Sequence, residues 1–351
     1  MNVMKYISVV FLAGLFVFLQ PAIGQTTDST TAINKVKFFA EDALINATIE
    51  CNWSKVIKEK NKEGREYPAR FISQLPENLS VNEPVELEVR GHFRRGECYL
   101  PPLKLGFKKS TGSQMHSLKS LKLVSTCKTN AASEQYVLKE FLCYKMYNIL
   151  TDKSFRVRLM KVDYKDSSSN KSVFQGHAFV IEDLKDMAKR NNCRDFSVHQ
   201  IPPEAAERKQ TTLMNLFQYM IGNTDWAVST NHNIRLIQSL DDTLSRPYTV
   251  AYDLDWSGIV STDYAVPAEM LGTQSVKERV YRGFPRSLEE LNETIALFNQ
   301  QKDKIFAAVN GLEPLSAKNK KGMIDYLEDF YKIINDPRQV KSIFIDNARV
   351  D

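Results

Sequence analysis

Residues 222–233 read Gly-Asn-Thr-Asp-Trp-Ala-Val-Ser-Thr-Asn-His-Asn, and they place one aspartate and three asparagines directly after an apolar helix pattern. A second stretch, residues 251–258, reads Ala-Tyr-Asp-Leu-Asp-Trp-Ser-Gly and puts two carboxylates after a strand-like run. Oxygen-rich side chains in this order suit hard divalent cations and the phosphates that accompany them. The two stretches therefore predict a polar site with metal and phosphate chemistry.

The patterns on either side of these stretches indicate an α+β chain. Most of the runs before residue 110 alternate apolar and polar residues, as residues 84–90 do, which is typical of half-buried strands. Residues 134–150 have apolar side chains at helical spacing, and residues 288–344 are helical in pattern again. This order predicts a β-rich N-terminal region, residues 36–110, and a larger α+β region with a helical end, residues 111–351.

The N-terminus has the pattern of a secretory signal peptide. Lys5 precedes an apolar run of 13 residues, Ile7 to Leu19, and small residues lead to a plausible cleavage site after Gly24. Such a run is short for a membrane-spanning helix, which needs about 20 apolar residues. We expect residues 1–24 to be removed and residues 25–35 to form a loose leader. The mature protein is then periplasmic or secreted, with no transmembrane segment.

Charge and cysteine content narrow the class of protein further. The formal net charge is +5 and the lysines are scattered among acids, so nucleic acid is not an expected partner. The chain has five cysteines, and an odd number in an exported protein leaves at least one unpaired. No CxxC motif occurs and the five histidines are dispersed, which argues against a zinc site.

One disulfide can be predicted from the strand pattern. Cys98 precedes the strand-like residues 102–107, and Cys127 follows the strand-like residues 121–124. If these two strands pair antiparallel, the start of one lies beside the end of the other. We therefore expect a Cys98–Cys127 disulfide, whereas Cys143 lies in a helix pattern and is expected to be a buried thiol.

The order of these motifs resembles the spore-coat-protein-H-like atypical kinases, a secreted branch of the protein-kinase-like fold. A closer resemblance, to exported proteins of Bacteroidetes-like bacteria, covers most of the chain. The resemblance to the kinases implies a two-lobed protein-kinase-like fold with a β-rich N-terminal part and a helical C-terminal part. It is carried by Arg90-Gly91, the strand near Lys104, residues 121–123 before Glu140, Gly176 with Glu182, residues 223–225 with His232-Asn233, and residues 252–255.

The resemblance also implies roles in phosphoryl transfer. Asp225 would orient or deprotonate the accepting hydroxyl group. Asn233 and Asp253 would bind a divalent cation, Mg²⁺ or Mn²⁺, and Asp255 would assist. The residues that bind ATP would be a lysine paired with Glu140 (Lys122 by its place on the strand before the helix, with Lys104 as the runner-up) and Glu182.

Three functions remain open on the sequence. The first is an exported kinase that transfers phosphoryl groups from ATP to a protein or a small hydroxyl acceptor. The second is a catalytically inactive protein of the same fold that acts as an envelope scaffold or binding module. This possibility stays open because the sequence departs from the kinase pattern in two places. The kinase catalytic loop has an asparagine five residues after the aspartate, whereas Asn231 and Asn233 follow Asp225 by six and eight residues. In addition, no GxGxxG motif precedes the lysine strand. The third is a metal-assisted hydrolase with Asp225, Asp253 and Asp255 as ligands.

Overall fold

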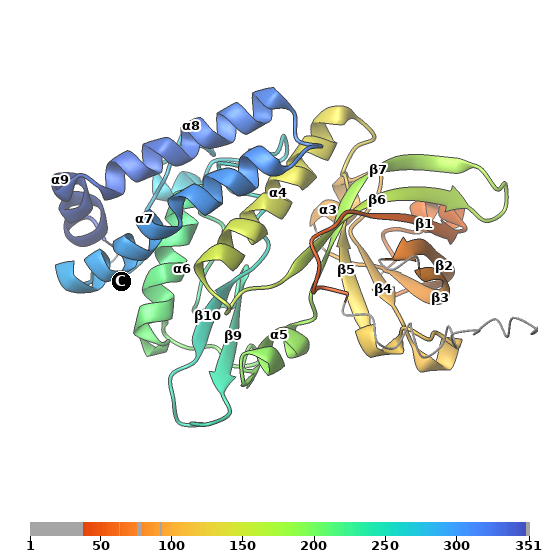
Figure 1. The fold of residues 1–351 in the computed structure, drawn as a ribbon, viewed down its shortest axis with the longest axis horizontal. Coiled ribbons are helices and arrows are strands. Elements are labelled where there is room, and N and C mark those ends of the chain that lie inside the picture. The colour runs from red at the N-terminus through yellow and green to blue at the C-terminus, as the bar shows by residue number, and fades with distance from the viewer. Residues whose placement is uncertain (1–37, 63, 76–78, 92, 349–351) are drawn as a thin grey trace, which may run out of the picture.

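Seven strands of the chain close into a barrel (Figure 1). The computed structural model describes residues 38–62, 64–75, 79–91 and 93–348, so the expected signal peptide and leader lie outside the described residues. The strands follow each other around the barrel in the order β1-β2-β3-β4-β5-β7-β6. They are β1 (Ile45–Cys51), β2 (Glu66–Leu75), β3 (Leu79–Val89), β4 (Leu103–Gly106), β5 (Ser120–Val124), β6 (Val157–Asp166) and β7 (Ser172–Ile181).

One parallel pair of strands closes this barrel, whereas all the other pairs of neighbouring strands in it are antiparallel. β1 runs parallel to β6, with Ile45 opposite Met160, and pairs antiparallel with β2 on its other side. Alternate residues of each strand face inward, and leucines of neighbouring strands meet there, for example Leu105 opposite Leu121. The apolar interior of the barrel is one of two hydrophobic cores.

The expected two-lobed protein-kinase-like fold is wrong. The strands form a closed mixed barrel rather than an open lobe, and the barrel draws strands from both sides of residue 110, up to Ile181. Two features account for the error. The strand Glu66–Leu75 was not predicted, and the pairing of β1 with the distant β6 leaves no local pattern in the sequence.

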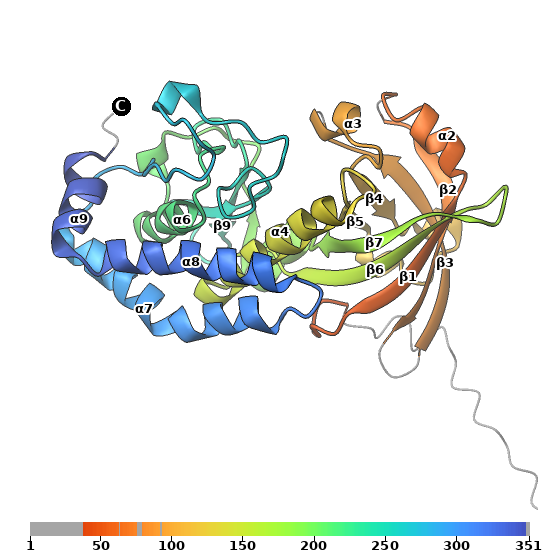
Figure 2. The ribbon, with the colours of Figure 1, turned by 90° about the horizontal axis from the view of Figure 1, so that it is seen from above.

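The rest of the chain forms a helical part around a second core (Figures 1 and 2). Helix α4 (Ala131–Leu150) contacts β6 and β7 on one side and α7 (Leu288–Gly311) on the other, so it joins the two parts. This part also contains α5 (Leu184–Arg190), α6 (Arg208–Ile221), α8 (Ala317–Ile334) and α9 (Pro337–Lys341), whereas the short helices α2 (Trp53–Lys58) and α3 (Phe93–Glu97) lie beside the barrel (Figure 2). In the described part of the chain, no helix has the length and apolar content that crossing a membrane requires.

A small antiparallel sheet in the helical part holds the two acidic stretches. Its order is β10 (Tyr248–Ala251), β9 (Ile234–Ser239) and β8 (Cys193–Asp195). Ile234 at the start of β9 lies opposite Ala251 at the end of β10. The residues just before β9 and just after β10 therefore leave the sheet at the same end, and these are the residues of the two acidic stretches.

Candidate functional site

Backbone hydrogen bonds join the two acidic stretches at both ends. At one end the N–H of Gly258 donates to the carbonyl of Gly222 over 3.0 Å. At the other end the N–H of Tyr252 donates to the carbonyl of Asn233 over 3.1 Å. The structure thus brings together two segments that are separated in the sequence by β9 and β10.

Gly222 is the tightest point of this junction. It ends α6 in the left-handed region at φ +67°, and a β-carbon there would collide with the hydroxyl of Tyr326. Gly222→Ala is expected to lower the free energy of unfolding by at least about 1–2 kcal/mol, because a left-handed residue with a side chain costs that much before any clash. Urea denaturation measures this loss.

Gly322→Ala is the matched control for this variant. Gly322 lies within α8, and a β-carbon there would meet nothing within 4 Å. Alanine should leave the stability unchanged or raise it slightly. Equal stability of the two alanine variants would contradict the tight junction at Gly222.

Asn233 and Asp253 both have left-handed backbones. Their φ angles are +49° and +57°, in a region that asparagine and aspartate adopt more readily than other non-glycine residues. The hydroxyl of Tyr144 accepts from the N–H of Asp253 over 2.9 Å. Residues elsewhere, such as Asn170 and Asn192, share this conformation, so the φ values describe tight turns at this end of the hairpin.

Asp225 is held by two partners from its own loop. The ring Nε2 of His232 lies 2.8 Å from its Oδ1, and the amide Nδ2 of Asn233 donates to its Oδ2 over 2.8 Å. The same amide also donates to the carbonyl of Asp225 over 2.9 Å. The carboxylate is about one-third exposed, so it is fixed in place and still open to solvent.

Two oxygen-bearing groups at this end of the hairpin are unengaged. Within the described ranges, no residue donates a hydrogen bond to Oδ1 of Asn233 or to the carboxylate of Asp253, and no cation lies within ion-pair distance of that carboxylate. The amide nitrogen of Asn233 is already used by Asp225, which leaves its Oδ1 as the only side-chain atom that can bind a ligand.

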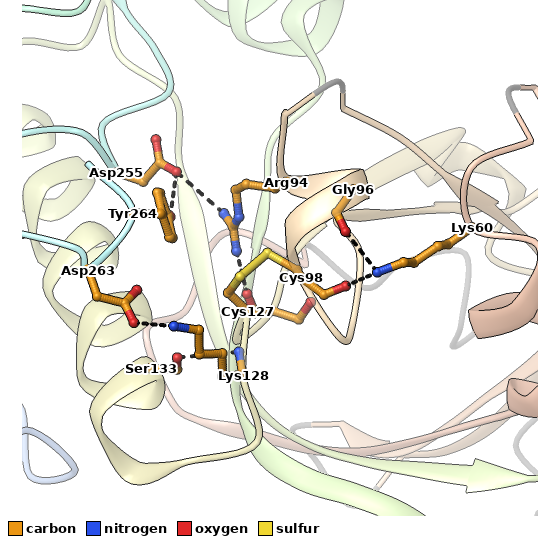
Figure 3. The surroundings of a disulfide bond; sticks show 11 residues. Lys60, Arg94, Gly96, Cys98, Cys127, Lys128, Ser133, Asp255, Asp263 and Tyr264 are labelled. Atoms are coloured by element: carbon orange, nitrogen blue, oxygen red, sulfur yellow. Dashed lines mark hydrogen bonds and ion pairs between the residues drawn. A yellow bond between two sulfur atoms is a disulfide. The ribbon is translucent and has the colours of Figure 1, made fainter. Parts of the chain in front are cut away.

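Asp255 is buried and already has partners (Figure 3). The hydroxyl of Tyr264 donates to its Oδ2 over 2.7 Å, and Nη1 of Arg94 lies 3.7 Å from the same oxygen. Burial and the nearby Asp253 raise the pKa of Asp255 to about 6, while Arg94 and Tyr264 oppose the shift. Oδ2 of Asp255 is therefore engaged within the protein, unlike Oδ1 of Asn233 and the carboxylate of Asp253.

Glu140 completes a buried acidic group with Asp255 and Arg94. Its side chain is only 3% exposed, and burial raises its pKa well above the ordinary value, as does the charge of Asp255. Arg94 acts in the opposite direction. Burial alone would lower the pKa of Arg94, but Tyr264, Asp255 and Glu140 raise it, so its guanidinium group stays charged. The positive charge of Arg94 therefore stabilises the charged forms of Asp255 and Glu140.

The disulfide anchors the segment that carries Arg94 (Figure 3). Cys98 and Cys127 are bonded, which confirms the expected pair. The chain forms the short helix α3 between Arg90 and the disulfide. Nη2 of Arg94 donates to the carbonyl of Ser125 over 2.7 Å. The other three cysteines, Cys51, Cys143 and Cys193, are buried free thiols.

The residues expected to bind the nucleotide are not gathered at one place. Lys104 forms an ion pair with Glu88 over 2.6 Å on the outside of the barrel. Glu182 binds Arg190 of α5, with Nε 3.0 Å from its Oε1. Among the described residues, no ion pair links Glu140 to either candidate lysine. Lys122 and Glu140 do reach the hairpin end. The ammonium group of Lys122 lies 4.4 Å from the centre of the Tyr252 ring, and the charges of Asp255 and Asp253 act on Glu140.

Sequence reasoning missed two residues of this site. Arg94 is one of three arginines between Arg90 and Gly96, and nothing in this run distinguishes the one that meets the buried carboxylates. The contact of His232 with Asp225 follows from the turn between Ala227 and His232, which bond through their backbones. A histidine seven residues after an aspartate carries no periodic pattern that would have predicted this contact.

The described residues contain no cluster of three or more His, Cys, Asp or Glu side chains placed to hold a metal ion. The two unengaged groups, Asn233 Oδ1 and the Asp253 carboxylate, still match one mode of binding. Mg²⁺ commonly binds through one or two carboxylates while phosphate and water oxygens complete its shell. Comparison with protein-family models and with curated proteins gives no match for this chain.

Proposed function

We propose that the end of the β9–β10 hairpin is a phosphoryl-transfer site that binds a divalent cation together with ATP. The observation that carries the proposal is that Asn233 and Asp253 lie at the same end of one hairpin, each with side-chain oxygen that no described residue engages. Asn233 and Asp253 would hold the cation, and the cation would neutralise charge on the phosphates. Tyr264 and Arg94 engage Oδ2 of Asp255, so Asp255 would assist through its Oδ1.

Asp225 has the position and the support of a base for the acceptor. Both of its oxygens are oriented, by His232 and Asn233, and each carboxylate oxygen can accept a further hydrogen bond. In the proposed reaction the acceptor hydroxyl gives its proton to Asp225 and its oxygen bonds to the terminal phosphorus of ATP. The bond from that phosphorus to the bridging oxygen breaks, and ADP leaves. The acceptor is a protein or a small molecule with a hydroxyl group.

Export belongs to the same proposal. A disulfide between Cys98 and Cys127 is stable in an oxidising compartment and rare in the cytosol. The N-terminal pattern of a signal peptide agrees with this compartment. Periplasmic or secreted placement would mean that ATP must be supplied outside the cytoplasm.

A thermal unfolding experiment tests the proposal directly. A ligand at about 100 times its dissociation constant should stabilise the folded protein by about 2.7 kcal/mol. We expect Mg²⁺ or Mn²⁺ with ATP to raise the melting temperature, and either component alone to raise it much less, because two protein groups make an incomplete cation site. Asp253→Asn should abolish the shift.

Asp325→Asn is the control for this experiment. Asp325 is an exposed carboxylate on α8 that pairs with Lys321, so its removal should leave the response to metal and ATP intact. If no combination of metal and ATP changes the melting temperature, phosphoryl transfer is rejected and the catalytically inactive scaffold or binding module is favoured. An equal loss of response in both variants would reject Asp253 as a ligand.

A further inference from the structure

We propose that the outer face of the barrel carries a binding site for a neutral oligosaccharide. The site is a hollow of about 600 Å³ over β3, β2, β1, β6 and β7, and this volume is usual for a small-molecule site. These five strands follow one another along one side of the barrel (Figure 1). The described residues that line the hollow include none from the end of the β9–β10 hairpin, so the hollow is separate from the proposed phosphoryl-transfer site.

Side chains of all five strands form one row across the hollow. Thr48 of β1 lies opposite Ile72 of β2 on one side and opposite Asp163 of β6 on the other. Ile72 lies opposite Asn82 of β3, and Asp163 lies opposite Gln175 of β7. Neighbouring strands are about 4.8 Å apart, so one extended ligand can contact several members of the row.

A second row lies two residues away along the same strands. Asn46 lies opposite Lys161, and Gln74 lies opposite Ser80. Successive side chains of a strand point to opposite faces, so residues that are two apart point to the same face. All four of these side chains are exposed and line the hollow, so the two rows together form its surface.

The amide side chains of the hollow have unused hydrogen-bonding groups. Within the described part of the chain, the side chains of Asn46 and Gln175 have no hydrogen-bond partner. Oε1 of Gln74 and Oδ1 of Asn82 accept from neighbouring side chains over 2.6 and 2.7 Å, which leaves the amide nitrogen of each as a donor. An amide group offers both donors and an acceptor, and a sugar hydroxyl also does both. A set of neutral amides therefore suits the hydroxyl groups of a saccharide.

The charges in the hollow favour a neutral ligand. Among its described lining residues, only Lys161 and Asp163 are charged, and they carry opposite signs two residues apart on β6. A second hollow on the outside of the barrel, of about 500 Å³, is instead lined by many charged side chains that pair with one another, such as Lys104 with Glu88. A protein partner is also disfavoured, because protein interfaces use aromatic and other large side chains as anchors, and the two rows offer only Ile72.

The residue types of the hollow are unusual for strands. Asparagine and aspartate are depleted in strands, yet Asn46, Asn82 and Asp163 occupy outward positions in three of them. An exposed strand position that needs only to be soluble can carry a residue type that favours strands, such as threonine. Departures from local preference gather at functional sites, so these three residues support a binding role for the hollow.

An array of neutral oligosaccharides of glucose, galactose, mannose and N-acetylglucosamine, with acidic glycans beside them, tests the site. We expect binding of neutral chains of several sugar units and weaker binding of the acidic glycans. In calorimetric titration with the best neutral chain, Asn46→Ala/Gln175→Ala should bind at least about tenfold more weakly, because it removes hydrogen-bonding groups from both rows. Asn292→Ala/Gln300→Ala is the matched control, since it removes one exposed asparagine and one exposed glutamine from α7. This control should bind as the wild type does.

Three results would overturn the oligosaccharide site. They are no binding of any neutral chain, acidic glycans bound as tightly as the neutral ones, and an equal loss of binding in the two double variants. Melting temperatures without ligand show whether each variant is folded. Binding should be the same in EDTA and in the presence of Mg²⁺ with ATP, so the result does not depend on the proposed function. Competition between ATP and the oligosaccharide would place the sugar at the hairpin end and reject the hollow.

Discussion

Arg94→Met is expected to destabilise the protein strongly at pH 8 and much less at pH 5. Removing one partner of a buried ion pair costs about 3–5 kcal/mol when the other charge stays buried. The guanidinium group of Arg94 is surrounded by Asp255, Glu140 and Tyr264, and the side chains of Arg94 and Asp255 are 13% and 6% exposed. At pH 5 the two carboxyl groups take up protons, so most of the penalty disappears.

The sign of this pH dependence follows from the raised pKa of Asp255. Its pKa is about 6 in the folded protein against an ordinary value of 3.8, so the folded state binds more protons than the unfolded state between these values. The contribution of Asp255 to stability therefore falls as the pH rises through this window. Without Arg94 the pKa values of Asp255 and Glu140 would rise further, and the loss would extend to higher pH.

Urea denaturation of both proteins at pH 5 and pH 8 measures the difference. Arg70→Met is the control, because Arg70 is exposed, donates to Asn82 on the outer face of the barrel and forms no ion pair with any residue that the structure describes. Its cost should be small and independent of pH. A loss in Arg94→Met of the same size at both pH values would contradict the role of Arg94 as the cation of the buried acidic group.

Removal of the Cys98–Cys127 disulfide is expected to cost on the order of 3–4 kcal/mol. The bond closes a loop with a sequence separation of 29, and the loss of loop-closure entropy in the unfolded chain accounts for a value of this size. The double variant Cys98→Ala/Cys127→Ala avoids a new free thiol, and chemical denaturation gives the change in free energy. Dithiothreitol should destabilise the wild type and leave the double variant unaffected.

Cys193→Ala provides the comparison for the disulfide variant. Cys193 is a buried free thiol, and its replacement removes one small apolar group without opening a loop. The double variant should lose clearly more stability than this control. A loss no larger than that of Cys193→Ala, or equal sensitivity of the double variant to dithiothreitol, would show that the disulfide does not stabilise the fold.

Local features of the fold were predictable from the sequence, and the long-range pairing was not. The alternation of residues 84–90 and the helical spacing of residues 134–150 correspond to β3 and α4. The disulfide followed from two neighbouring strands, since Leu103 of β4 does lie opposite Leu123 of β5. The closure of the barrel depends on β1 meeting β6, and the period of a strand does not specify its partner.

The same distinction applies to the candidate site. Asp225 and Asn233 bond because they belong to one loop. The pairing of β9 with β10 brings the segment of Asp253 to the same end of the hairpin. Contacts between neighbouring segments of the chain were therefore enough to predict this part of the site. Lys104 and Glu182 instead form ion pairs with residues of other elements. Lys104 pairs with Glu88 of β3, and Glu182 pairs with Arg190 of α5. Such pairings depend on how strands and helices pack, which residue types alone do not determine.

The closed barrel has a consequence for how the chain can fold. Closure gives every strand of the barrel a neighbour on both sides, although β4 pairs with only Glu86 to Val89 of the longer β3. During synthesis, however, β1 keeps one unpaired edge until residues 157–166 emerge and supply β6. The edge of β1 is therefore covered only once nearly half of the chain is available, and its dependence on a distant partner strand predicts slow folding.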